Sequence, residues 1–459
     1  MFGGEDTIYE FILTFLAAIL IIVSWSVTRH LFNPLSVYTF VWYIGLLTAM
    51  LNWVGFEEID VYGWIIIGIS CFAFALGFFT VVIAYKAVSR RYIRFARTFY
   101  SLGDDVEIDK VKTLILLFCM ISLISICYEW FSILRISGSF SGFLANANSI
   151  YSERIKGYGP PSIPYLSSFA LAASALAGVQ IARARQFNFL NILPLGLVFL
   201  SNLASMGRTG IFMALGLYVT PYLVFVNIKS REQRSNVKGR VKLIVVVLLI
   251  SLVVIMGTNF IRDARGGIES YSMPQSRLLD ILQKIGLFRP SLYVYIGGPL
   301  VTFAESLYVD PNVLGRGEVP GMQTFAPFFR FLSKLGLSTP VAYYEEFVDI
   351  GIGQMNTGTY LKDVYIDFGI PGVVVFPYLL GFFVTLLYQR TRRNPNIFYL
   401  TTISFLYLYI EMSALLNLFR LGYYIISFAA ALAGVLVISG KRKAIKLKLG
   451  DETVEFPTR

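Results

Sequence analysis

The chain has 459 residues, of which 56% are hydrophobic and only 15% are charged, and its formal net charge at pH 7 is +11. Soluble domains carry roughly 25% charged residues, so the composition excludes a soluble enzyme and indicates a protein embedded in a membrane. The basic residues lie in short segments between apolar stretches, which is typical of a topology signal and argues against a nucleic-acid-binding surface.

Eleven apolar segments are long enough to cross a bilayer, whose ~30 Å hydrocarbon core requires about 20 residues per helix. The sequence therefore predicts an all-α polytopic membrane protein in three parts. Residues 1–260 carry eight spans, residues 261–368 form a large extracytoplasmic loop, and residues 369–459 carry three spans and a basic tail. The predicted spans are 8–28, 35–55, 61–85, 113–134, 164–182, 187–206, 209–228, 242–260, 369–388, 397–416 and 421–440.

The distribution of Lys and Arg predicts the orientation of these spans. If the N-terminus lies outside, the inner segments hold 25 of the 39 Lys and Arg residues and the outer segments hold 14. Acidic residues before the first span and after the second show the opposite bias. Because an excess of Lys and Arg keeps short loops in the cytoplasm, we expect the N-terminus outside and the C-terminus inside.

Two of the predicted outer segments are long. The first, 135–163, contains four glycines and two prolines and is expected to form an irregular flap. The second, 261–368, has apolar residues at helical spacing in 277–285 and again from Phe325 to Leu335. We expect both stretches to form amphipathic helices in the membrane interface, over a cavity that opens sideways to lipid.

Arg208 lies in a tight turn between two predicted spans, next to Gly207 and close to Gly210. The glycines permit close backbone approach, and a guanidinium can bind a phosphate through two parallel hydrogen bonds. The alternative is an interfacial anchor whose charge reaches up to the lipid headgroups.

The large loop contains more arginine than the outer side of a membrane protein usually carries. Arg262 and Arg265 would lie on one face of a continuing helix and could bracket a pyrophosphate, with Asp263 orienting one of them. A surface pair between arginine and aspartate is the alternative. Arg289, directly before Pro290, is a weaker candidate for the same role.

Arg420 ends a short outer turn, nine residues after Glu411. Glu411 lies within a predicted span, where an ionised carboxylate is costly unless it is paired, so it is either functional or part of an interhelical ion pair. A transferase also needs a carboxylate that accepts a proton. Asp263 and Asp367 are candidates for that role together with Glu411. Two further outer carboxylates, Glu305 and Asp363, are not distinguished from them by the sequence.

The side chains that usually hold metals or form hydrolytic triads are scarce. His30 is the only histidine, and Cys71, Cys119 and Cys127 all fall within apolar segments, where inert thiols are expected. The Asp-x-Asp metal motif of enzymes that use nucleotide sugars is also missing. We predict no metal and no cofactor, and a lipid-pyrophosphate donor in place of a soluble activated sugar.

In its order of spans and in three short stretches, the chain resembles the bacterial O-antigen polymerases, which are Wzy-type oligosaccharide repeat-unit polymerases. The stretches cover roughly a tenth of the residues, and the pattern of spans covers the whole chain. They are Gly207–Gly210 at the start of a span, Asn356–Thr359 running into Tyr365–Gly372, and Glu411–Arg420.

The resemblance implies a metal-independent glycosyltransferase of the membrane-embedded C-type (GT-C) architecture. Such an enzyme transfers a growing glycan from undecaprenyl pyrophosphate to a new lipid-linked repeat unit at the outer face of the cytoplasmic membrane. The expected partners are these two lipid-linked glycans, membrane lipids, a flippase and a chain-length regulator. The resemblance also implies that Arg208, Arg262 or Arg265, and Arg420 contact the substrate. It includes Asp367 in a motif, where capping of a helix is the alternative to catalysis.

Three other functions remain open on the sequence. An O-antigen ligase shares the architecture but relies on an outer histidine, which this chain lacks. A flippase for the same lipid-linked glycan would be expected to show internal repeats with broken spans in matching halves, and none is visible. A non-catalytic assembly scaffold would make the outer arginines expendable.

Overall fold

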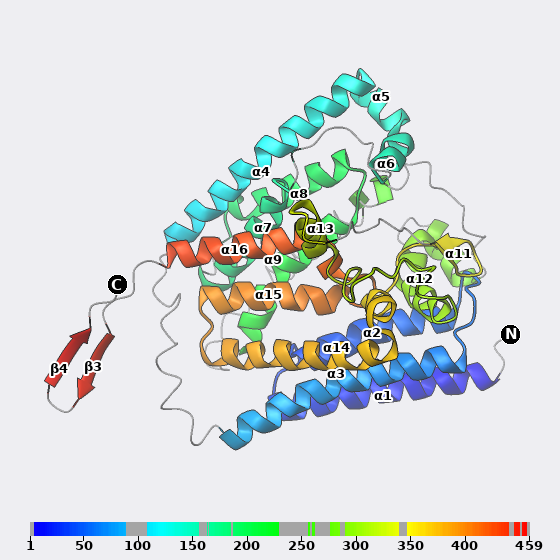
Figure 1. Ribbon diagram of the computed structural model, residues 1–459, viewed down its shortest axis with the longest axis horizontal. Coiled ribbons are helices and arrows are strands. Elements are labelled where there is room, and N and C mark those ends of the chain that lie inside the picture. The colour runs from blue at the N-terminus through cyan, green and yellow to red at the C-terminus, as the bar shows by residue number, and fades with distance from the viewer. Residues whose placement is uncertain are drawn as a thin grey trace.

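The protein is mostly helical, as Figure 1 shows for the computed structural model. The structure describes residues 4–88, 108–155, 163, 165–184, 187–228, 256–257, 259–261, 276–284, 290–338, 347–439, 445–449 and 452–456. Among these residues, strands occur only in two hairpins, β1 (Val348–Asp349) with β2 (Gln354–Met355), and β3 (Ile445–Leu449) with β4 (Glu452–Phe456).

Six of the helices are long and apolar enough to cross a membrane. Four shorter apolar helices pack among them, and most of the predicted span at 242–260 lies outside the described residues. The chain is thus a helical membrane-embedded protein, while the number of eleven spans and their orientation stay predictions. The six are α1 (Gly4–Thr28), α2 (Pro34–Leu51), α3 (Val61–Val88), α4 (Ile108–Ser137), α9 (Thr209–Ile228) and α14 (Tyr360–Arg393), and the four are α7 (Ser168–Ala184), α8 (Phe189–Ala204), α15 (Ile397–Met412) and α16 (Gly422–Ile438).

Helix α7 forms the centre of the bundle. It is rich in alanine and buried on all sides, and it packs against α4, α8, α9, α15 and α16. A helix that is apolar around its whole circumference can be enclosed in this way, and small residues allow its neighbours to approach closely. At Gly178 the approach is so close that a Cβ atom would overlap the carbonyl of Tyr218 on α9.

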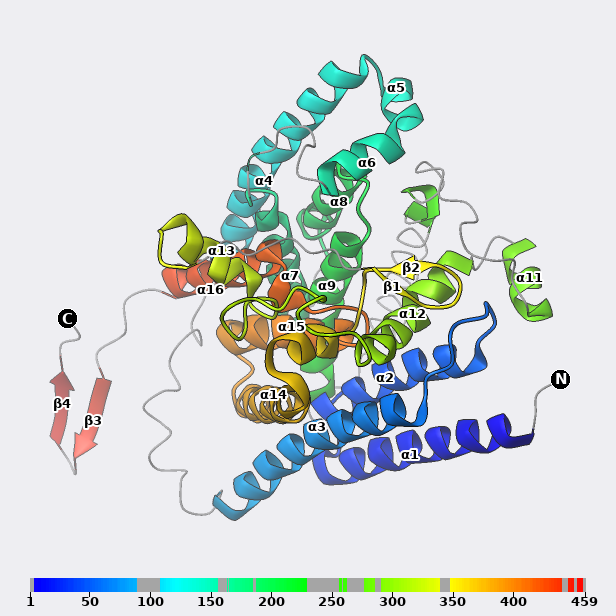
Figure 2. The same ribbon diagram turned by 45° about the vertical axis from the view of Figure 1, so that its right-hand side comes forward.

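Helices α3 and α14 form a second closely packed pair. Gly77 of α3 lies against the carbonyl of Tyr378, and Gly381 of α14 lies against the carbonyl of Phe74. The two helices therefore run side by side, as Figure 2 also shows. We call the end of the bundle at which α14 and α16 begin the entry end.

Helix α14 begins at Tyr360, before the predicted boundary at residue 369, and is broken at Gly369. The backbone there has φ 62° and ψ −156°, a combination that essentially only glycine adopts. The ring of Tyr360 packs against that of Phe376 with centroids 5.7 Å apart, although the two residues lie on opposite sides of the break. The segment 360–368 therefore folds back against the rest of α14.

The large loop contains a helix that the sequence analysis missed. Helix α12 (Pro290–Ser306) is buried against the second half of α2, where the Leu300 side chain fills the space beside Gly45. The backbone N–H of Thr359 donates to the carbonyl of Pro299 at 3.4 Å, which ties α12 to the start of α14. Helix α12 is not among the six helices that are long and apolar enough to cross a membrane, and most of its residues are buried.

Both amphipathic stretches of the loop are helical, as predicted, in α11 (Arg277–Lys284) and α13 (Ala326–Lys334). The expectation of an irregular flap at 135–163 is wrong for its first part, which forms α5 (Phe140–Ala145) and α6 (Ala147–Ile155). Gly138, with φ 72°, follows the end of α4, and Ser139 caps α5. Phe143 then buries its ring in a cluster with residues of α4 and α9, which holds these short helices on the bundle.

Candidate functional site

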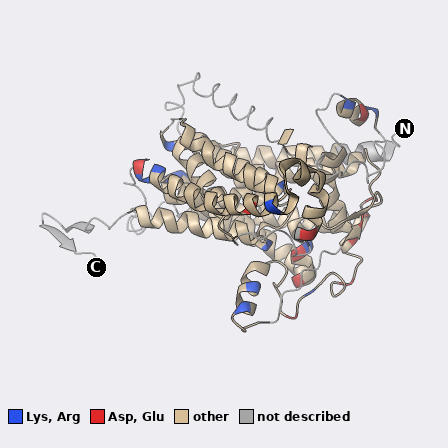
Figure 3. Ribbon diagram, turned by 90° about the horizontal axis from the view of Figure 1, so that it is seen from above, with Lys and Arg blue, Asp and Glu red and all other residues tan. Residues whose placement is uncertain are grey.

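Most of the charged residues that the structure describes lie toward the two ends of the bundle, as the coloured ribbon in Figure 3 shows. At the entry end, two carboxylates and one arginine from segments far apart in the sequence come together with a backbone turn. We call this group the α14–η3 site. It consists of Asp363 and Asp367 on α14, Arg420 on the 3-10 turn η3 (Leu418–Arg420), and Gln323 and Thr324 in the turn before α13.

Arg420 and Asp363 form an ion pair in this site. The guanidinium Nη1 donates to Asp363 Oδ1 at 3.1 Å. The Asp363 side chain is only 6% exposed, whereas that of Arg420 is 29% exposed. The nearly enclosed carboxylate therefore holds an arginine that is still accessible from outside the bundle, and guanidinium groups are well suited to bind phosphates.

Asn417, whose role the sequence analysis missed, fixes the turn that carries Arg420. Its side-chain oxygen accepts hydrogen bonds from the backbone N–H of Phe419 at 3.1 Å and from the hydroxyl of Tyr409 at 3.0 Å. Its Nδ2 donates to the carbonyl of Thr324 at 3.2 Å. Asn417 is 3% exposed, so one buried amide joins α15, η3 and the turn before α13. The only local signal is an asparagine at the cap of a turn.

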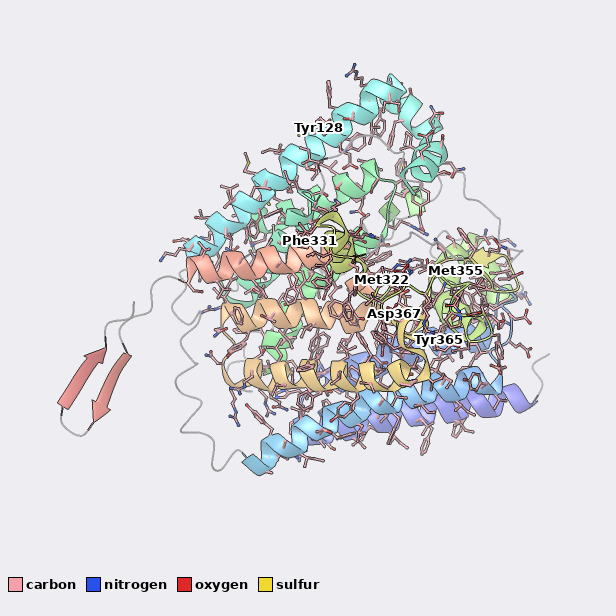
Figure 4. All side chains as sticks on the ribbon, viewed as in Figure 1. Tyr128, Met322, Phe331, Met355, Tyr365 and Asp367 are labelled. Atoms are coloured by element: carbon pink, nitrogen blue, oxygen red, sulfur yellow. The ribbon has the colours of Figure 1, made fainter. Side chains whose placement is uncertain are left out.

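Asp367 is bound to backbone amides of the same turn. Its carboxylate accepts from the N–H of Gln323 at 3.1 Å and from that of Thr324 at 2.6 Å, and the residue is 2% exposed. Figure 4 shows Asp367 near Met322, the residue before this pair. Residues 323 and 324 precede Phe325, the N-cap residue of α13, so Asp367 anchors a turn and does not cap this helix. A role as a catalytic base stays a prediction, and it would require access to a carboxylate that the fold encloses.

Arg208 lies at the start of α9, where its carbonyl accepts from the N–H of Ile211 at 3.1 Å. Its guanidinium lies 5.5 Å from the ring centroid of Tyr295 on α12, a cation–π contact. The side chain of Asn202 fills the space beside Gly210, which explains the glycine at that position. Helix α12 also packs against α14, so the same helix contacts Arg208 and the element that carries Asp363.

Glu411 lies in the last turn of α15 and faces α9. Its Oε1 accepts a hydrogen bond from the hydroxyl of Thr220 at 2.7 Å, and its other oxygen lies next to Gly216. Arg420, which follows it in the third motif, forms its ion pair with Asp363 instead. The structure therefore places Glu411 in a polar contact between helices and not in the α14–η3 site.

Four predicted residues lie outside the part of the chain that the structure describes: Arg262, Asp263, Arg265 and Arg289. Ile261, immediately before the first of them, is fully buried in a cluster with Met206 and Ile211. The large loop therefore leaves the bundle beside the turn that contains Arg208.

A separate acidic group surrounds Glu305, which the sequence analysis named among the outer carboxylates. Burial, together with the nearby Glu57, Asp60 and Asp349, raises the pKa of Glu305. The pKa of Asp60 is lowered, because hydrogen bonds from Tyr308 and from backbone N–H groups outweigh the effect of its burial. Because these carboxylates would repel negative charge, we do not expect an anionic substrate to bind beside Glu305.

Within the described segments, no three His, Cys, Asp or Glu side chains are grouped so that they could hold a metal ion. Comparison of the chain with protein-family models, curated proteins and solved structures returns no match.

Proposed function

We propose that the protein is a membrane glycosyltransferase that polymerises oligosaccharide repeat units linked to undecaprenyl pyrophosphate, and that the α14–η3 site binds the pyrophosphate. The observation that carries this proposal is the Arg420–Asp363 ion pair at the entry end of an apolar helical bundle. A partly exposed arginine held by a buried carboxylate suits the anionic headgroup of a lipid. The entry end would then face the outside of the cytoplasmic membrane.

The reaction breaks the bond between the anomeric carbon of the donor glycan and the pyrophosphate oxygen. A hydroxyl of the acceptor sugar forms the new glycosidic bond and loses its proton to a base, and the lipid pyrophosphate departs with the bonding electron pair. Cations stabilise the charge on the leaving group, the role that we propose for Arg420 and Arg208. Asp363 and Asp367 are the carboxylates of the α14–η3 site that could accept the proton, and Asp263, which lies outside the described residues, is a further candidate from the sequence.

The test uses the full chain in nanodiscs with lipid-pyrophosphate-linked repeat units, and the products are separated on a gel. Wild type is expected to give a ladder of polymer. Arg420→Ala should reduce its formation by about 10²–10³-fold, the usual loss when one group that stabilises the transition state is removed. Lys284→Ala is the matched control, because this lysine is 73% exposed and pairs with Asp280 on α11. No ladder from folded wild-type protein with the correct repeat unit would contradict the proposal.

A flippase for the same lipid-linked glycan is the second candidate, because α14 is broken at Gly369 and discontinuous helices are typical of transporters. The two functions are separated with sealed proteoliposomes that carry the repeat-unit lipid in both leaflets. Accessibility of the inner-leaflet lipid to an added glycosidase, without any polymer, would favour transport.

A further inference from the structure

Helix α13 carries an apolar face that is not covered by the described residues. Phe328 is 58% exposed, Phe331 60% and Leu335 57%, and Leu337 beyond the helix is 70% exposed. Large side chains exposed to this degree on one short helix exceed what a soluble surface usually shows.

This face is distinct from the side on which α13 packs against the protein. Ala326 is fully buried and clusters with Met322 and Phe329. Phe328, Phe331 and Leu335 follow one another at spacings of three and four residues, which places them on one stripe of the helix. The helix thus has one apolar side for the protein and a second apolar side without a described partner.

The position of α13 limits what can cover that second side. Helix α13 contacts η3 and also α16, which begins two residues after η3 ends, and the ring of Phe325 lies 5.8 Å from that of Phe419. Figure 2 shows α13 beside α16, and Figure 4 shows Phe331 at the entry end of the bundle. Since α16 is an apolar helix of the membrane-embedded bundle, its first residues lie near the boundary between lipid and water.

We propose that α13 is an interfacial helix whose apolar stripe lies among the acyl chains of the lipid leaflet at the entry end. Lys334, in its last turn and exposed, has the charge that pairs with lipid phosphates, and basic residues flanking an apolar stripe are typical of such helices. A protein partner is not required, because at this depth the bilayer itself surrounds the bundle.

The inference goes beyond the proposed function, since lipid contact does not depend on any reaction. It also predicts the side from which the lipid-linked substrate of that function would reach Arg420. Arg420 directly follows Phe419, whose ring contacts Phe325 at the start of α13. A lipid whose tail stays in the leaflet could therefore bring its phosphates to Arg420 from the side, without leaving the membrane.

The test measures the depth of a nitroxide probe in proteoliposomes by electron paramagnetic resonance. Phe331→Cys is labelled in a background with Cys71→Ala and Cys127→Ala, because Cys127 is exposed and Cys71 is partly exposed, whereas Cys119 is buried. Val313→Cys, at a loop position that is 65% exposed, is the control. The probe at 331 is expected to collide more with lipid-soluble oxygen than with a water-soluble nickel chelate, and the probe at 313 should show the reverse.

Two outcomes would overturn the inference. Equal access of the nickel chelate to both probes would place α13 in water, and protection of the 331 probe from both collision partners would mean that protein covers it. A second variant, Phe328→Ser with Phe331→Ser, should raise the half-saturating concentration of the lipid-linked substrate about tenfold and leave the maximal rate unchanged. If wild type makes no polymer, the proposed function fails while the depth measurement still decides this inference.

Discussion

At the scale of single residues, Asp363 and Arg420 depend on each other. Asp363 is enclosed, so removing the guanidinium leaves a buried carboxylate without its counter-charge, whereas removing both charges leaves no such defect. This asymmetry distinguishes a coupled pair from two independent surface charges.

We expect Arg420→Ala to lower the free energy of unfolding by about 1–3 kcal/mol, the usual penalty for an unsatisfied buried polar group. Asp363→Asn in the same chain should restore part of that loss. The measurement is the thermal unfolding of the two single variants and the double variant in detergent. If the losses simply add in the double variant, the two residues are not coupled.

The pKa of Glu305 predicts a dependence of stability on pH. A carboxyl whose pKa is raised in the folded protein stabilises the fold below its ordinary pKa, and that contribution is lost as pH rises through the folded value. Glu305→Gln should therefore stabilise the protein at pH 7 by at most about 1 kcal/mol, because the group is partly solvated. Melting curves at pH 4 and pH 7 check this. A difference from wild type that is larger at pH 4 would contradict it.

The sequence singles out residues whose signal is local, and the roles of these residues stay predictions. Arg208 and Arg420 stood out because basic residues are scarce on the outer side, where the predicted topology places them. Asn417 did not, because its partner Thr324 lies far away in the chain and only the fold brings them together. The pairing of Arg420 with Asp363 was unpredictable for the same reason.

At the scale of elements, the break in α14 sets the geometry of the site. The segment 360–368 carries both carboxylates, and its position depends on the backbone conformation at Gly369. After the break, the close contacts at Gly77 and Gly381 hold the remainder of α14 against α3.

Gly369→Ala should cost about 1–3 kcal/mol, because a side chain is strained at this backbone conformation. It should also reduce polymer formation by displacing Asp363. Gly68→Ala is the matched control, since nothing lies within 4 Å of the added Cβ atom on α3 and alanine favours the helix. Thermal unfolding of both variants is the measurement, and equal stability would show that the break is not constrained.

Helices whose apolar residues recur at a clear helical spacing were predicted. One buried helix and two short helices were not. The helical spacing in α11 and α13 was visible because apolar residues recur at intervals of three and four with charged residues between them. Helix α12 shows no such alternation, because most of its residues are buried and it contains Gly297, Gly298 and Pro299. The helices α5 and α6 are short, and the glycines and prolines in the same segment indicated an irregular loop instead.

At the scale of the whole molecule, hydropathy locates most of the helices, because each must satisfy its own backbone within the lipid. Their mutual arrangement follows from close contacts at Gly77, Gly178 and Gly381, and a single sequence does not show which glycine meets which helix. The described apolar helices could therefore be predicted from the sequence, whereas the packing around α7 could not, and the number of spans stays a prediction.

The predicted orientation is tested by cysteine labelling in intact cells. Glu58→Cys, in the exposed connection between α2 and α3, should react with a membrane-impermeant maleimide added outside. Arg393→Cys, at the end of α14, should react only after the membrane is permeabilised. The reverse pattern would invert the topology and move the α14–η3 site to the cytoplasmic side.

The way in which Asp367 is bound bears on how the protein can evolve. Its carboxylate recognises the backbone N–H groups of residues 323 and 324, and every amino acid except proline supplies such a group. A substitution in this turn that fits the enclosed space around it would therefore keep the attachment to the carboxylate. Under the proposed function, such a turn could change its side chains to suit other sugars while it stays attached to α14.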